Sequence, residues 1–174
     1  MVITPCEFER TTIDIQFAFD SATRISGLVF RPTVRTAAPH TLPSYAKPSS
    51  FVEREMTLGS SEWALPATLT IPSGRGPWPG VVLVHGSGPN DRHETVGANR
   101  PFKNLATGLA SLGIAVLRYD KRTLVHRAKV GTLKDFTVRQ EVIEDALEAV
   151  KALRAQPGVD PKRCSCSGTA SAGC

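Results

Sequence analysis

The chain of 174 residues is poor in aromatic residues, which make up 6% of it, and no apolar run is long enough for a membrane-spanning helix. The first ten residues lack the apolar core of a secretory signal, so a cytoplasmic location is the default expectation. The hydrophobic fraction of 41% and the charged fraction of 21% are ordinary for globular proteins and argue against wholesale disorder. This length predicts one domain, or one domain and a fragment of another.

Charge of one sign is not strongly in excess either. The chain has 21 basic and 16 acidic residues, a net charge of +5, and the charges are spread along it. The densest basic stretch is 118–134, and Asp120 interrupts it. Nucleic-acid binding is therefore not predicted. A non-catalytic protein that holds an acidic ligand or partner on this stretch stays open as an alternative.

Cysteines are few and unevenly placed. Cys6 stands alone, whereas Cys164, Cys166 and Cys174 lie within the last eleven residues. A disulfide framework would distribute cysteines along the chain, and a zinc site would need CxxC-like pairs or neighbouring histidines. The sequence therefore predicts no metal site and no cofactor.

The first fifty residues are expected to lie outside the main fold. Residues 11–19 alternate polar and apolar side chains, 20–23 form a turn, and 25–30 return, so 1–31 is predicted to hold a β-hairpin. An isolated hairpin is marginal in water, and its partner sheet is expected upstream of Met1. Residues 32–50 contain four prolines and predict a linker.

Residues 51–163 alternate strand and helix patterns. Two strands form a hairpin, a short apolar strand is buried on both faces, and two amphipathic helices and one further strand follow. These elements are predicted at 51–58, 63–71, 81–84, 101–112, 114–119 and 137–153. Thr137 and Gln140 have the spacing of a capping box at the start of the second helix. Strand, helix and strand with short connections predict an α/β fold with a mainly parallel sheet.

The glycine-rich loop that follows strand 81–84 carries the most chemical information. His85-Gly-Ser-Gly88 ends a buried strand in small residues, which suits an oxyanion hole built from backbone N–H groups. The alternative is a turn that needs glycine only for a positive φ. The third glycine of a dinucleotide-binding loop and the Gly-Lys-Ser/Thr of a P-loop are both absent.

Each titratable residue near this loop has two interpretations. His85 could be a catalytic base, but a structural residue that holds the loop is favoured. Asp120 could be a catalytic acid, or a turn or salt-bridge residue. His93 and Glu94 are expected in an exposed, solvated loop, and no partner is evident for His126.

Three segments resemble the bacterial α/β-hydrolases of the dienelactone-hydrolase and serine-esterase group. They are residues 79–92, which include Val-Leu-Val-His-Gly-Ser-Gly-Pro-Asn-Asp, and residues 95–106 and 113–122. The resemblance extends over about 51–163, and residues 11–31 are similar to the end of an accessory domain found in some members. It implies a partial α/β-hydrolase fold, with the N-terminal strands and two helices of the sheet.

The same resemblance implies a function. A small-molecule ester or related acyl compound would be hydrolysed by a serine nucleophile without a metal. The backbone N–H of Ser87 would be one oxyanion donor, and His85, Gly86 and Gly88 would support its loop. The family often carries Asp where this chain has His93.

The tail departs from the family. After residue 163 the family has an apolar strand and then Gly-x-Ser-x-Gly, with the acid and the histidine further on. This chain has Cys-Ser-Cys-Ser-Gly-Thr-Ala-Ser-Ala-Gly-Cys instead. Ser171 is a poor candidate nucleophile, because Thr169 replaces the first glycine and no acid or histidine follows. Residues 164–174 are therefore predicted to be a non-native or disordered tail.

A shift of one base in the reading frame accounts for this tail. Every Cys codon is TG plus a pyrimidine, so 164–167 read one base earlier become four apolar residues when the Ser codons are TCN. The following codons can then read Gly-His-Ser-Leu-Gly-Gly. We predict an inactive fragment of a serine hydrolase that aggregates through strand 81–84, left at the sheet edge. A natural low-complexity tail and a pseudoenzyme scaffold are the alternatives.

Overall fold

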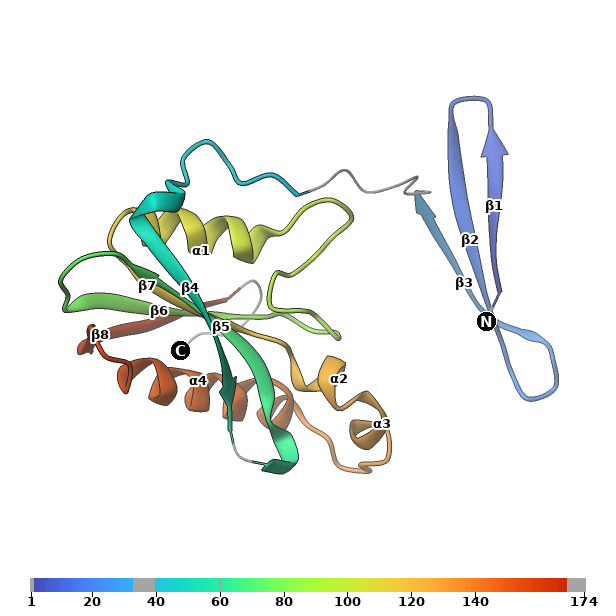
Figure 1. The fold of residues 1–174 in the computed structure, drawn as a ribbon. Helices are drawn as coiled ribbons and strands as arrows, with labels where there is room; N and C mark the ends of the chain where they lie inside the picture. Colours follow the sequence, from blue (N-terminus) through green and yellow to red (C-terminus); the bar gives the residue numbers. More distant parts are fainter. Residues whose placement is uncertain (1, 33–39, 60, 169–174) are drawn as a thin grey trace. The chain divides into compact units, whose positions relative to one another are not determined.

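The computed structural model describes residues 2–32, 40–59 and 61–168 (Figure 1). The chain divides into two compact units, Met1–Pro39 and His40–Cys174. Within the described residues, no helix has the length and hydropathy needed to cross a membrane.

The first unit is a three-stranded antiparallel sheet in the order β1 (Val2–Phe8), β2 (Thr11–Phe19), β3 (Ile25–Pro32). The two strands of the predicted hairpin are present. A third strand, β1, pairs with β2 along its whole length, whereas the partner was expected upstream of Met1. Nearly all residues of β1 are exposed, and its sequence has no apolar periodicity, so this strand could not be predicted from the sequence. Its proline, Pro5, is tolerated because β1 is an edge strand.

The second unit holds a five-stranded mixed sheet in the order β4-β5-β7-β6-β8. Its strands are β4 (Phe51–Leu58), β5 (Leu65–Pro72), β6 (Trp78–Val84), β7 (Ala115–Tyr119) and β8 (Val159–Gly168). β4, β5 and β7 pair antiparallel, and β6 lies parallel to both β7 and β8. The α/β class predicted from the sequence is confirmed, as is the β6–α1–β7 crossover.

Two helices cover opposite faces of this sheet, α1 (Pro101–Ser111) and α4 (Glu144–Arg154) (Figure 1). Successive side chains of β6 point to opposite faces of the sheet, so each face has its own apolar cluster. Val82 and Val84 pack in the cluster under α4, and Leu83 packs in the cluster under α1. The larger cluster also contains the buried face of α4, namely Ala146, Ala149 and Leu153.

The second helix begins at Val138, as its capping box and apolar stripe predict, but its first turn is a π-helix and not a regular α-helix. Residues Arg139–Ile143 form a π-helix, and regular α-helix begins only at Glu144. Half of the predicted capping box is present, since Gln140 Oε1 accepts a hydrogen bond from the Thr137 backbone N–H at 2.8 Å. Two short helices, α2 (Arg122–Val125) and α3 (Arg127–Val130), connect β7 to this region.

Part of the predicted linker packs on α1. The Nε2 atom of His40 lies 2.8 Å from Asn104 Oδ1, and the Lys47 backbone N–H donates to Ser111 Oγ at 2.8 Å. Proline-rich sequence cannot form a core by itself, but it can dock on a helix by such polar contacts. Within the described residues, the second unit therefore begins at residue 40, before the first strand of its sheet.

The first half of the tail differs from the prediction of a non-native or disordered segment. Residues 164–168 extend β8 and pair with β6. Cys164 and Cys166 pack against the core, while Ser165 and Ser167 are exposed. A ladder uses main-chain groups, and cysteine packs as a small apolar residue, so Cys-Ser-Cys-Ser satisfies the period of a strand. Ser171 lies outside the described residues.

This strand also changes the expected sheet edge. β6, which contains 81–84, has β7 on one side and β8 on the other. β8 itself lies at the edge of the sheet as far as the structure describes the chain. The prediction that 81–84 is an exposed edge is therefore wrong, because the Cys-Ser repeat pairs with it despite its low hydrophobicity.

Candidate oxyanion loop

His85 anchors the loop that leaves β6. Its side chain is 1% exposed, and its Nε2 lies 2.7 Å from the backbone oxygen of Tyr119 at the end of β7. The ring stacks on Phe102, with 4.8 Å between the ring centroids. Burial lowers the pKa of His85, which favours the neutral ring. A carbonyl can only accept, so Nε2 carries the proton and joins the ends of two parallel strands.

The next carbonyls of the loop are bound by the segment that follows β7. Lys121 Nζ donates to the Gly86 oxygen at 2.6 Å, and Thr123 Oγ1 donates to the Gly88 oxygen at 3.1 Å. The Lys121 backbone N–H donates to the Asn90 oxygen at 3.1 Å. Gly88 has a φ of +101°, a conformation that favours glycine. The loop is therefore held in one conformation by residues 121–123.

Ser87 faces away from these contacts. The residue is exposed, and its backbone oxygen accepts a hydrogen bond from Asn90 Nδ2 at 3.3 Å. Within the described residues its backbone N–H has no hydrogen-bond partner. It lies at the carboxyl end of the parallel strand β6, where open α/β sheets bind their ligands. This N–H can therefore donate to an oxygen that arrives from outside the chain.

An ion-pair network holds the following segment. The Asp120 Oδ1 atom accepts from Arg92, at 2.7 Å from the backbone N–H and at 3.2 Å from Nε. Arg92 also binds Glu55 and donates to Thr68 Oγ1 at 2.9 Å. Burial tends to raise the pKa of Glu55, but hydrogen bonds from Thr68 and Arg92 outweigh it and lower that pKa. Asp120 therefore forms a salt bridge with Arg92, which is one of the two roles that the sequence allowed.

His93 and Glu94 are half-buried, not solvated as the sequence suggested. Arg118 Nη1 lies 2.9 Å from His93 Nδ1, and its other terminal nitrogen binds Glu53. Burial lowers the pKa of His93, and the charge of Arg118 adds to this effect. Arg118 is the single charged residue of the buried strand β7, so its contact with a histidine in a distant loop could not be inferred from spacing.

His126 has a partner that the sequence could not reveal. Its Nε2 lies 3.0 Å from the backbone oxygen of Ala64, and its ring meets Trp63 edge-on. Among residues 2–32, 40–59 and 61–168, no hydrogen bond joins a serine hydroxyl to a histidine, and no cluster of three or more His, Cys, Asp or Glu could hold a metal ion. The described residues therefore contain the glycine-rich loop after β6 without a serine–histidine pair.

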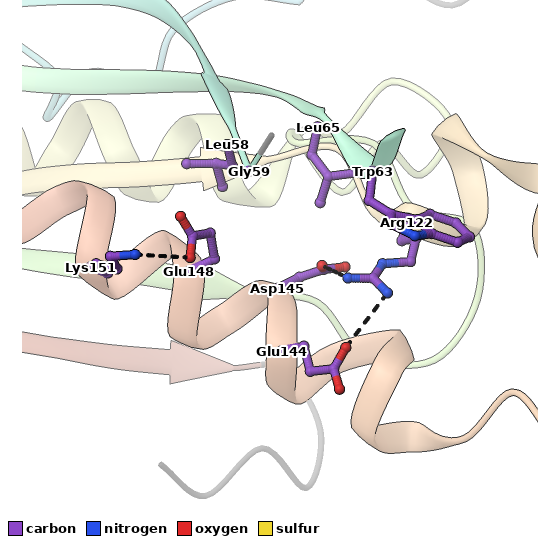
Figure 2. Close-up of a pocket in the computed structure, with 9 residues that line it drawn as sticks. All are labelled: Leu58, Gly59, Trp63, Leu65, Arg122, Glu144, Asp145, Glu148 and Lys151. Carbon is purple, nitrogen blue, oxygen red and sulfur yellow. Dashed lines mark hydrogen bonds and ion pairs between the residues drawn. The ribbon is translucent and has the colours of Figure 1, made fainter. Parts of the chain in front are cut away.

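A separate cavity of about 490 Å³ lies between the β4–β5 turn and α4 (Figure 2). Its charged groups are paired with one another. Arg122 binds Asp145 and lies 3.7 Å from Glu144, and Lys151 lies 3.8 Å from Glu148. Burial raises the pKa of Asp145, while Arg122 opposes that shift. The pairs of Arg122 join α2 (Arg122–Val125) to α4, and the Lys151–Glu148 pair lies within α4. Each charged side chain that lines the cavity therefore already has a partner of opposite charge.

Comparison with known proteins shows which sequences and folds the chain resembles. No family model matches the chain. Esterase EstD of Thermotoga maritima is 48% identical over 153 residues, which cover 88% of this chain and 35% of that protein. The chain thus spans about a third of the length of this curated relative.

Two solved structures share its fold. Brefeldin A esterase, a bacterial protein, superposes with a TM-score of 0.51 at 24% identity, over 78% of this chain and 35% of its own. Esterase Est22 with p-nitrophenol superposes with a TM-score of 0.50 at 18% identity, over 71% and 36%. The chain is therefore similar to about a third of a bacterial esterase, and its fold is a part of the α/β fold of these esterase structures, as its resemblance to the dienelactone-hydrolase and serine-esterase group implied.

Proposed function

We propose that the chain is part of a serine esterase in which residues 85–88 supply one oxyanion donor, the backbone N–H of Ser87. The observation that carries this proposal is the Gly86–Ser87 peptide at the carboxyl end of β6. Its carbonyl is bound by Lys121, and its N–H has no partner within the described residues. His85, Gly86 and Gly88 hold the loop. The substrate class is a small-molecule ester or related acyl compound.

In this mechanism a serine hydroxyl adds to the substrate carbonyl, and a histidine takes its proton. The oxygen that becomes negative accepts hydrogen bonds from Ser87 N–H and from the residue after the nucleophile. The alcohol then leaves with the proton from the histidine, and water hydrolyses the acyl-enzyme. Of these groups, only the Ser87 donor is assigned to the described residues.

We further propose that the tail arises from a one-base shift in the reading frame. Cys164 and Cys166 occupy the inward positions of β8. The shifted frame would fill both positions, and their two neighbours, with larger apolar residues. The elbow serine would then follow directly after β8, which is where the family carries it.

The binding-protein alternative has less support. It needs the basic stretch 118–134 as an anion-binding surface, yet three of its cations are buried and paired with carboxylates. Arg118 binds Glu53, Lys121 binds Glu141 and Arg122 binds Asp145. Their charge is neutralised inside the chain.

The test is hydrolysis of a short-chain activated ester together with labelling by a fluorophosphonate probe. The chain as it stands is expected to be negative in both, because loss of a nucleophile or base costs about 10⁶-fold in kcat in a protease. Repair of the frame and restoration of the downstream sequence should make both positive. Stoichiometric labelling of the unrepaired chain that disappears in Ser171→Ala would overturn this proposal.

A further inference from the structure

Lys121 is a buried cation with two partners on different elements. The residue is 1% exposed, and its Nζ lies 2.6 Å from the Gly86 oxygen and 2.6 Å from Glu141 Oε1. Glu141 belongs to the π-helix Arg139–Ile143. An ammonium group is buried only at high cost unless it is paired and hydrogen-bonded. Glu141 neutralises the charge, but neutralisation alone does not require the contact with Gly86.

The contact with Gly86 belongs to a pattern. The carbonyls of Gly86, Gly88 and Asn90 all accept hydrogen bonds from residues 121–123. The carbonyl of Ser87, in between, is bound instead by the side chain of Asn90. Alternate carbonyls of the loop are thus bound by the segment after β7, whereas the Ser87 carbonyl between two of them is bound within the loop.

The Gly86 oxygen and the Ser87 N–H belong to one planar trans peptide and point in opposite directions. An ammonium group that fixes the oxygen therefore fixes the direction of the N–H. It also polarises the amide, which makes the N–H a stronger donor. We infer that Lys121, held by Glu141, is a positioning residue that orients and polarises the Gly86–Ser87 peptide for an oxyanion. This inference rests on the proposed function.

The test follows the NMR chemical shifts of the Gly86–Ser87 peptide group in the isotope-labelled chain. Lys121→Met keeps the length of the side chain and removes the donor. We expect an upfield shift of the Ser87 amide nitrogen and of the Gly86 carbonyl carbon, because both nuclei lose deshielding when the hydrogen bond to the carbonyl is lost. Lys134→Met, at an exposed lysine, is the matched control and should leave both unchanged. A folded Lys121→Met chain with unchanged Ser87 and Gly86 signals would overturn the inference.

A second measurement needs no variant and decides the matter if Lys121→Met does not fold. In the unmodified chain, a scalar coupling through the hydrogen bond should connect Lys121 Nζ to the Gly86 carbonyl carbon. Its absence, with the Lys121 ammonium signal observed, would overturn the inference. Both measurements read the peptide group without turnover. Their failure is therefore distinguishable from failure of the esterase proposal, which the ester and probe assays report.

Discussion

Leu153 of α4 lies directly against the backbone of β6 at Gly80. A Cβ at Gly80 would lie 2.9 Å from Leu153 Cδ2 and 3.2 Å from Cys164 Sγ. Glycine is therefore required here by space, and the helix approaches the sheet as closely as it does because β6 has no side chain at this point. The same contact ties α4, β6 and β8 together.

We predict that Gly80→Ala destabilises the second unit by about 1–3 kcal/mol, as expected for an extra methyl group in a packed core. Leu153 is buried and cannot turn away into solvent. Urea unfolding followed by circular dichroism measures the change. Gly131→Ala is the control, because the nearest atom to its Cβ would be 3.4 Å away and its φ of −64° suits alanine. Equal stability of the two variants would contradict the packing argument.

Acidification should destabilise the fold through His85. Burial lowers its pKa in the folded state, whereas the unfolded value is about 6.5. Between these two values the unfolded chain binds a proton that the folded chain does not. The stabilising contribution is therefore present above about pH 6.5 and is lost as the pH falls from there through the lowered folded pKa. His93, whose pKa is also lowered, acts in the same direction.

The measurement is the free energy of unfolding between pH 8 and pH 5. Its decrease should be smaller in His85→Gln, whose amide can still donate to the Tyr119 carbonyl. The difference between the two proteins at pH 8, where the histidine is neutral in both states, gives the packing cost alone. An identical pH dependence in the variant would show that His85 does not contribute.

Aggregation is expected at the free side of β8. As far as the structure describes the chain, β8 is the last strand of its sheet, and its outward residues Ser165 and Ser167 are short and uncharged. Ser165→Lys should reduce association, because a lysine on an edge strand opposes pairing with another chain. Light scattering of the eluted species measures it, with Ser73→Lys, at an exposed loop serine, as the control. A monodisperse monomer of the unmodified chain would remove the basis of this prediction.

The frame-shift proposal is tested by the nucleotide sequence from codon 160 onward. The frame one base earlier should encode four apolar residues and then Gly-His-Ser-Leu-Gly-Gly. It should also stay open well past codon 174, with an acidic residue and a histidine downstream. An early stop codon or a different elbow sequence in that frame would contradict the proposal.

The sequence by itself determined the α/β class, the strands β4 to β7 and the two long helices of the second unit. Period-two and period-3.6 patterns are local, and the glycines of residues 85–88 mark a loop, in which Gly88 takes a positive φ. Cys-Ser-Cys-Ser in β8 also alternates as a strand does. This strand was not predicted because its hydrophobicity is low.

Only the tertiary structure decided which distant groups meet. Lys121 binds the Gly86 carbonyl 35 residues away, Arg118 meets His93, and His126 meets the Ala64 carbonyl. These contacts use backbone oxygens, which every residue has, or a cation enclosed in an apolar strand. Neither the residue types nor their spacing in the sequence predicts these contacts. They follow from the order β5-β7-β6, which brings the end of β7 beside the loop after β6.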